Sequence, residues 1–216
     1  GRVLDVNDNP LAGVTVTVVD GMPVAADGAE ARPFPATGTT GADGSYSVEA
    51  PVTQRAAVNF TKAGYVLTSR IIPVTKDETT VLPEAVMAPI GTTADIDAAT
   101  GGTVAAGDGG AVVIGANTLV DDEGNAFDGT ATVGLTTFNP TTSAGLNAFP
   151  GDFEGVNASG DTVPFQSFGF MDVTIMDPDG NHLQLDRTRA GTADIAIPIP
   201  ASLSGSAPDT MPLWYF

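Results

Sequence analysis

The chain has 216 residues, 42% of them hydrophobic, and contains no cysteine. Acidic residues outnumber lysine and arginine by 26 to 8, so the formal net charge at pH 7 is -18. This charge disfavours nucleic acids and anionic membranes as partners, because both bind through clustered lysine and arginine. The lack of cysteine excludes disulfides and thiolate chemistry, and no run approaches the roughly 20 apolar residues that span a bilayer, so we expect no direct membrane insertion.

Stretches of strand-like sequence follow one another along the chain. Each has the length of a strand, is rich in β-branched or aromatic residues and is bounded by Gly, Pro, Asn or Asp. The predicted strands cover residues 14–19, 45–48, 56–60, 66–74, 111–114, 130–137, 170–176 and 193–199. Apolar residues nowhere keep a helical spacing for three turns, so we predict an all-β chain with at most short helical turns.

Two prolines and a change of composition mark a module boundary near Gly91. Pro83 and Pro89 end one run of strands, and a segment rich in Gly and Asp opens the next. The length of the chain also suits two ordinary cores better than one. We therefore predict two consecutive β-sandwich modules, residues 1–90 and residues 91–216.

Turn signals separate the predicted strands. They lie at residues 9–10, 27–28, 43–44, 122–125, 159–161 and 178–181, and consist largely of Asn, Asp, Gly, Pro and Ser. These residue types favour the tight reversals of hairpin loops. We expect hairpins to close at these places.

Four segments occur in a fixed order in the first module: GRVLD at residues 1–5, PLAGVTV at 10–16, TGADGSYSV at 40–48 and FTKAGY at 60–65. This combination resembles carboxypeptidase regulatory-like domains and covers nearly all of the module. The resemblance implies a transthyretin-like, seven-stranded sandwich that serves as a non-catalytic accessory module in secreted and surface proteins. No peptidase activity follows from the family name.

The second module has its own set of segments: GGTV at residues 101–104, VIGANTL at 113–119, GTATV at 129–133, FPGDF at 149–153, SFGFMDV at 167–173 and PLWYF at 212–216. It is similar to the ZU5-related sandwich that follows such modules in bacterial surface proteins and in cartilage intermediate-layer protein. Those relatives continue beyond the last segment with a further strand. The resemblance therefore implies a second module that is truncated at its C-terminal end.

Acidic turns supply clustered oxygen atoms, which are the ligands that calcium prefers. The candidate ligands are Asp5, Asn7 and Asp8 in one turn and Asp121, Asp122 and Glu123 in another. A third turn, residues 177–181, fails the EF-hand pattern because its glycine comes too early and no Glu closes it. Turn statistics favour solvated hairpin loops in all three places. We expect no cofactor, and calcium is the alternative.

His182 is the only histidine, which excludes a metal site with several histidine ligands and limits any Ser-His-Asp relay to this residue. The chain has no Gly-x-Ser-x-Gly elbow, and we predict that it is not an enzyme. A carboxylate pair for glycoside hydrolysis stays open, because 26 acidic residues allow many pairings whose separation the sequence does not give.

Two further features bear on glycans. An aromatic platform for sugar stacking is one interpretation of Phe149, Phe153, Trp214, Tyr215 and Phe216, although an aromatic content of 6% favours packing in two cores. In addition, Asn59-Phe60-Thr61 and Asn157-Ala158-Ser159 match the acceptor pattern for N-glycosylation.

These features favour a non-catalytic structural or adhesive module of a secreted or cell-surface multidomain protein. A subunit of an extracellular assembly is one such role. The expected partners are other domains of the same polypeptide or neighbouring subunits. The alternative is a carbohydrate-binding accessory domain of a larger enzyme, whose partners would be glycans.

Overall fold

The computed structural model describes residues 1–20, 33–50, 52–75, 77–149, 154–157, 159–164, 166–189, 193–211 and 213. Within them, strands make up most of the regular structure, and the helices α1 (Ser143–Asn147) and α2 (Ala201–Ser204) are short, which confirms the all-β prediction. No helix in this part of the chain is long and apolar enough to cross a membrane.

The chain divides into two compact units. Unit 1 comprises Gly1–Pro89, Thr142–Gln166 and Pro208–Phe216, and unit 2 comprises Ile90–Thr141 and Ser167–Ala207. Neither unit is one continuous stretch of sequence, because the chain passes between them at residues 89–90, 141–142, 166–167 and 207–208.

Unit 1 contains a four-stranded antiparallel sheet in the order β3-β2-β4-β5. The strands are β2 (Thr15–Asp20), β3 (Pro33–Thr39), β4 (Thr53–Thr61) and β5 (Thr68–Val74). Val16 and Val18 of β2 lie opposite Phe60 and Val58 of β4, and all four side chains are at most 4% exposed. Residues two apart in a strand share a face, so this alternation buries one face of the sheet.

A parallel pair, β1 (Val3–Asp5) and β6 (Ala85–Met87), completes the core of unit 1. Val3 faces Ala85 in register, and both side chains are fully buried in the same cluster as the apolar residues of β2 and β4. Side chains from two sheets therefore share one core in this unit. Each large side chain buried there contributes roughly 1.5–3 kcal/mol before the entropic cost of ordering is subtracted.

The strand predicted for residues 45–48 is wrong. Asp43 Oδ1 accepts hydrogen bonds from the backbone N–H and the hydroxyl of Ser45 at 3.0 and 2.7 Å, and Ser45 pairs only through an isolated bridge. Tyr46 still packs edge-on against Phe60, with ring centroids 5.5 Å apart. The buried Tyr46 hydroxyl has no hydrogen-bond partner among the described residues, and burial raises the pKa of this side chain.

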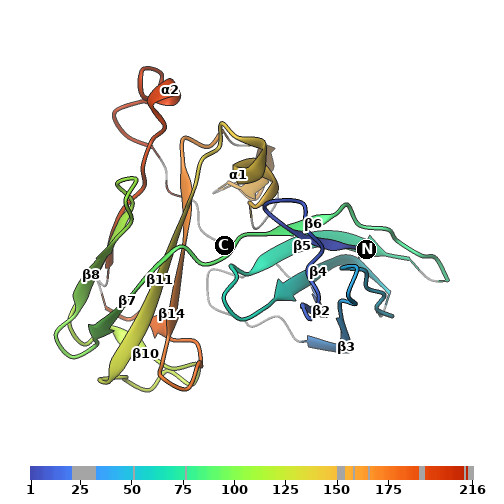
Figure 1. Cartoon of the computed structure of the whole chain (residues 1–216), viewed down its shortest axis with the longest axis horizontal. Helices are drawn as coiled ribbons and strands as arrows, with labels where there is room; N and C mark the ends of the chain where they lie inside the picture. The colour runs from blue at the N-terminus through green and yellow to red at the C-terminus, as the bar shows by residue number, and fades with distance from the viewer. Residues whose placement is uncertain are drawn as a thin grey trace. The chain divides into compact units, whose positions relative to one another are not determined.

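Unit 2 contains the antiparallel sheets β14-β11-β7 and β16-β9-β8 and the pair β10-β15. The strands are β7 (Thr92–Asp97), β8 (Gly102–Ala105), β9 (Ala111–Ile114), β10 (Leu119–Val120), β11 (Thr130–Phe138), β14 (Phe170–Met176), β15 (Gln184–Leu185) and β16 (Ala193–Ala196). The bounds of β9 and β14 agree with the prediction. Figure 1 shows β11 between β7 and β14, and Val133 of β11 faces Ala94 and Ile175 across the sheet.

Side chains from both three-stranded sheets form the core of unit 2. Val133 and Leu135 of β11 pack in one cluster with Val112 of β9 and Val104 of β8, and none of the four is more than 2% exposed. The β-branched residues that dominate these strands suit a pleated surface covered on one side. Thr132 of β11 and Asp95 of β7, which pair in register and bond each other, lie on the opposite face.

The segment Thr142–Gln166 lies between β11 and β14 in the sequence but belongs to unit 1. It contains α1, which begins at the N-cap Thr142, and the hairpin of β12 (Glu154–Val156) and β13 (Thr162–Pro164). The Arg70 guanidinium of β5 donates to the backbone carbonyls of Phe149 and Asn147 at 3.1 and 3.4 Å. Arg70 thereby joins β5 to the end of α1.

A five-residue hairpin loop with one backbone pattern recurs in both units. The N–H of the first residue donates to the carbonyl of the fifth, and the N–H of the fourth donates to the carbonyl of the first. The fourth residue has a positive φ of 63 to 96°. Within the described residues the loops with this pattern are 5–9, 41–45, 106–110, 121–125, 157–161 and 177–181.

In four of these loops a side chain closes the turn, and we call them Asx-closed loops: 5–9, 121–125, 157–161 and 177–181. Their first residue is Asp or Asn, its Oδ1 accepts the backbone N–H of the fifth residue, and the first and fifth side chains bond each other. Asp and Asn side chains favour such turns because they mimic a backbone acceptor. The hairpins predicted at 122–125, 159–161 and 178–181 are confirmed, and the hairpin predicted at 27–28 lies outside the described residues.

Candidate functional site

Two Asx-closed loops border a hollow of about 390 Å³ in unit 2. The hollow is lined by residues of loop 121–125, of loop 177–181 and of the chain that follows each: Asp121, Asp122, Glu123, Phe127, Asp177, Asn181, His182 and Leu183. β10 leads into the first loop and pairs with β15, which follows the second loop. This pairing brings together two acidic turns that the sequence separates by more than 50 residues.

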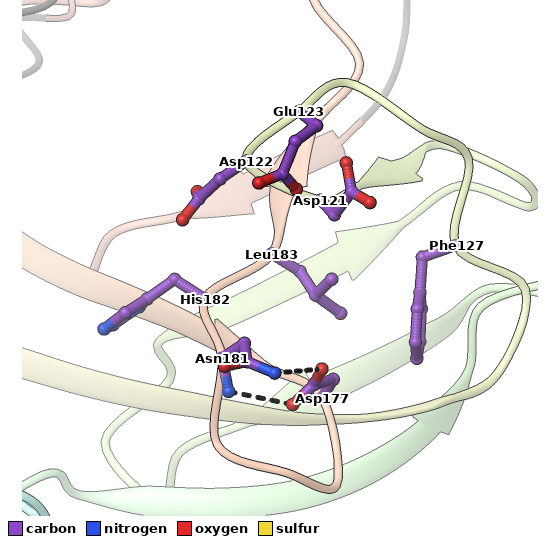
Figure 2. Close-up of a pocket in the computed structure, with 8 residues that line it drawn as sticks. All are labelled: Asp121, Asp122, Glu123, Phe127, Asp177, Asn181, His182 and Leu183. Carbon is purple, nitrogen blue, oxygen red and sulfur yellow. Dashed lines mark hydrogen bonds between the residues drawn. The ribbon is translucent and has the colours of Figure 1, made fainter.

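The hollow has an apolar floor and an acidic rim. Figure 2 shows Leu183 between the two loops and Phe127 to one side, whereas the His182 side chain extends away from both. Leu183 is 6% exposed and Phe127 packs against the core of unit 2. His182, the only histidine of the chain, lines the hollow and is exposed.

The carboxylates of Asp121 and Asp177 are occupied by their own loops. Asp177 Oδ1 accepts the backbone N–H groups of Asp179 and Asn181 at 2.9 and 2.8 Å, and Asp177 Oδ2 accepts Asn181 Nδ2 at 2.9 Å (Figure 2). Asp121 makes the equivalent bonds with Asn125. The side-chain hydrogen bond from the asparagine is the largest cause that lowers the pKa of each aspartate, so both stay ionised at neutral pH.

The remaining acids of the hollow lie on its rim. Asp122 Oδ1 accepts a hydrogen bond from Gln184 Nε2 at 3.0 Å, which links the loop to β15. Asp122 and Glu123 are both exposed. Solvent therefore surrounds the two carboxylates of this turn that do not close it.

The other candidate calcium turn, loop 5–9 of unit 1, has the same construction. Asp5 Oδ1 accepts the backbone N–H groups of Asn7 and Asn9 at 2.8 and 2.9 Å, and Asp5 Oδ2 accepts Asn9 Nδ2 at 3.0 Å. The side-chain hydrogen bond from Asn9 is the largest cause that lowers the pKa of Asp5. Asn7 and Asp8 are exposed, and Asp8 is the one fourth-position residue of these loops that is not glycine.

No cluster of three or more His, Cys, Asp or Glu side chains in the described residues has an arrangement that could hold a metal ion. The structure brings the turns at Asp121 and Asp177 together, and it places the turn at Asp5 in the other unit. Of the six predicted ligands, Asp5 and Asp121 accept N–H groups of their own loops. Asp122 accepts a hydrogen bond from Gln184, and the other three, Asn7, Asp8 and Glu123, are exposed.

Sequence reasoning missed Asp172, an acid in the middle of β14. Its partner across the sheet is Thr136 of β11, and Thr174 Oγ1 donates to Asp172 Oδ2 at 2.7 Å. Burial raises the pKa of Asp172 and outweighs the lowering by the Thr174 hydrogen bond and by the charge of His182. The sequence signal is a single acid within the apolar strand FMDVTIM.

The aromatic residues proposed for sugar stacking do not form a platform in the described part of the chain. Phe149 is 3% exposed and follows α1 in unit 1. Phe153, Trp214, Tyr215 and Phe216 lie outside the described residues. Phe138 and Phe170 stack with ring centroids 5.0 Å apart, at the paired ends of β11 and β14.

Comparisons of the chain with protein-family models, curated protein sequences and solved structures gave no match.

Proposed function

We propose that the chain is a non-catalytic structural or adhesive part of a secreted or cell-surface protein, and that its two units are β-sandwiches. The observation that carries this proposal is the use of polar residues in the Asx-closed loops. In each loop, a side-chain oxygen of the first residue accepts a backbone N–H group and thereby fixes the hairpin. These first residues are Asp5, Asp121, Asn157 and Asp177. A protein that presents or joins neighbouring parts needs such fixed connections between strands, whereas a catalytic or metal-binding loop needs acceptors free for a ligand.

The sandwich part of the proposal is supported by the cores. In each unit, apolar side chains from two separate sheets enter one cluster. That arrangement is how two sheets bury their inner faces against each other. The same proposal includes the expected relation of residues 1–90 to transthyretin-like carboxypeptidase regulatory-like domains and of residues 91–216 to ZU5-related sandwiches.

The ionisation of the acids supports a non-catalytic role. Glycoside hydrolysis by two carboxylates needs one acid whose pKa is raised, so that it carries a proton at working pH. At the hollow of unit 2, hydrogen bonds within the loops instead lower the pKa values of Asp121 and Asp177. Asp172 does have a raised pKa, but it does not line the hollow and accepts the Thr174 hydroxyl within β14. Each carboxylate is thus suited to holding its turn and unsuited to donating a proton.

Sedimentation velocity and thermal unfolding, each with calcium and with a chelator, test the proposal. A structural role predicts that the chelator leaves the melting temperature and the sedimentation coefficient unchanged. Association that grows with protein concentration identifies an assembly subunit, and a concentration-independent coefficient identifies a spacer between other domains. Unfolding in chelator, or turnover of polysaccharide substrates that is lost in an Asp122→Asn variant, would contradict the proposal.

A further inference from the structure

The chain contains two triplets with the acceptor pattern for N-glycosylation, at Asn59 and at Asn157. The structure gives these asparagines different surroundings. An enzyme that modifies a folded protein must bind several residues of backbone around its target, and exposed loop tips are where this is possible.

Asn59 lies within a central strand. β4 is hydrogen-bonded to β2 on one side and to β5 on the other, where Asn59 faces Thr17 and Ser69 in register. Ser69 Oγ also donates to Asn59 Oδ1 at 2.8 Å. Access to the backbone around Asn59 therefore requires that β4 leave the sheet.

Asn157 is the first residue of the Asx-closed loop between β12 and β13. Within the described part of the chain, these three-residue strands pair only with each other. Its Oδ1 accepts the backbone N–H groups of Ser159 and Asp161, both at 2.9 Å. Ala158 lies outside the described residues. The other three Asx-closed loops begin with Asp, which has no side-chain amide. This loop is therefore the only one of the four whose first residue has an amide nitrogen that a sugar can be attached to.

The hydrogen bonds of the Asn157 side chain leave room for one substituent. Asn157 Nδ2 has two hydrogens, and one is donated to Asp161 Oδ2 at 3.3 Å. The second has no acceptor among the described residues. After Nδ2 is bonded to a sugar it still carries one hydrogen, which is the number that its bond to Asp161 requires.

We propose that Asn157 is an N-glycosylation site of the folded protein and that Asn59 is not. The co-reactant is an oligosaccharide linked to a lipid diphosphate. Asn157 Nδ2 forms a bond to the anomeric carbon, the bond from that carbon to the diphosphate oxygen breaks, and the lipid diphosphate leaves with the electron pair. The amide proton passes to a base of the transferase. Whether the protein meets such an enzyme in the cell rests on the proposed secretion. The ability of Asn157 to accept a glycan in the folded protein does not.

The test is glycosylation in vitro of the purified, folded chain made in a host that does not glycosylate it. A purified oligosaccharyltransferase and lipid-linked oligosaccharide are added, and intact mass and peptide mapping locate the product. We expect a single glycan on the unaltered chain and on Asn59→Gln, and none on Asn157→Gln or Ser159→Ala. Ser159→Ala retains the asparagine and its loop bonds, so its loss of glycan identifies recognition of the triplet.

A denatured sample of the unaltered chain shows that the enzyme is active on its sequence. A folded chain that stays unmodified while the denatured chain accepts glycan would overturn the proposal, as would modification of Asn59 in the folded chain. Thermal melts confirm that each variant is folded before the reaction. These outcomes are independent of the chelator and sedimentation experiments, so failure here leaves the proposed structural function standing.

Discussion

At the scale of single residues, aspartates in this chain act in two opposite ways. Asp177 accepts three hydrogen bonds in an exposed loop, which stabilise the ionised form and lower its pKa. Asp172 is largely withdrawn from water in β14, which destabilises the ionised form and raises its pKa. The folding stability that each contributes therefore changes with pH in opposite directions.

Asp177→Ala is expected to lower the melting temperature at neutral pH, because the loop loses the acceptor for its own N–H groups. The folded-state pKa lies below the unfolded value of about 3.9, so this contribution is present above that pH and is lost as pH falls through the folded-state pKa. Melting curves from neutral pH to below pH 3.9 measure the difference. Asp179→Ala in the same loop is the control, and an equal loss in both variants would contradict the role of Asp177.

Asp172→Asn is expected to raise the melting temperature at neutral pH, because the amide avoids the cost of burying a charge and still accepts from Thr174. The folded-state pKa lies above the unfolded value, so the cost is full above the folded-state pKa and vanishes as pH falls to about 3.9. The matched control is Asp95→Asn, since Asp95 accepts the Thr132 hydroxyl from an exposed position. A gain that is equal at Asp95 would argue against burial as the cause.

Gly180→Ala tests the backbone of the hairpin loops. Gly180 has a φ of 85°, and nothing lies within 4 Å of an added Cβ, so the cost is purely that of the left-handed conformation. That cost is roughly 1–2 kcal/mol, partly offset by the lower entropy of the unfolded chain, which leaves a net loss of about 1 kcal/mol. Chemical denaturation measures it. Gly107→Ala is the control, because it is equally open and has no positive φ, and it is expected to be neutral or slightly stabilising.

At the scale of secondary structure elements, the local sequence pattern predicts where strands begin and end, but it does not indicate which distant strands pair. The β-branched runs at 111–114 and 170–176 lie between explicit turns, so both ends of β9 and β14 could be predicted. The parallel pairing of β1 with β6 joins residues more than 80 positions apart and has no local signal. At 45–48 an alternating run was mistaken for a strand, because the capture of Ser45 by Asp43 is a competing local interaction.

The candidate site shows the same limit. The acidic turns are visible in the sequence, but composition alone does not tell whether a carboxylate faces a ligand or its own backbone. The spacing of four residues between Asp121 and Asn125, and between Asp177 and Asn181, is the signal that distinguishes the two. The meeting of both turns around Leu183 depends on the pairing of β10 with β15, which the sequence does not specify.

Arg70→Ala is expected to loosen the end of α1, because it removes the donor to the Phe149 and Asn147 carbonyls. Hydrogen bonds from a charged group are worth roughly 1.5–3 kcal/mol when partly buried, so we expect a loss of about 2 kcal/mol. Hydrogen exchange should quicken at the amides of Leu146 and Ala148, which bond within α1. Unchanged exchange at these amides would refute the contact. Arg187→Ala, an exposed position, is the control.

At the scale of the whole molecule, the net charge affects stability and the connectivity of the strands affects the order of folding. A net charge of -18 is distributed over a chain whose described ion pairs are limited to Arg2–Glu84 and Arg189–Asp186. Most carboxylates thus repel one another without a cation nearby. Self-repulsion of this kind destabilises the compact state and is weakened by salt, whose screening length is about 10 Å at 0.1 M.

The melting temperature is therefore expected to rise when sodium chloride is added to a low-salt buffer. The rise should be steepest at low ionic strength, where screening changes most, and then level off. Differential scanning calorimetry at fixed pH measures it. A melting temperature that falls with salt would show that attractive ion pairs outweigh repulsion between carboxylates.

The repeated loops also bear on the order in which the chain folds. Each one closes over only five residues, so the entropy lost on closure is small, and short hairpins form within microseconds. Pairing of β11 with β14 or of β1 with β6 must close far longer stretches and is correspondingly slower. The hairpins that these loops close would then be early, independent nuclei. Substitutions in the loops should slow folding, whereas substitutions in β1 or β6 should mainly speed unfolding.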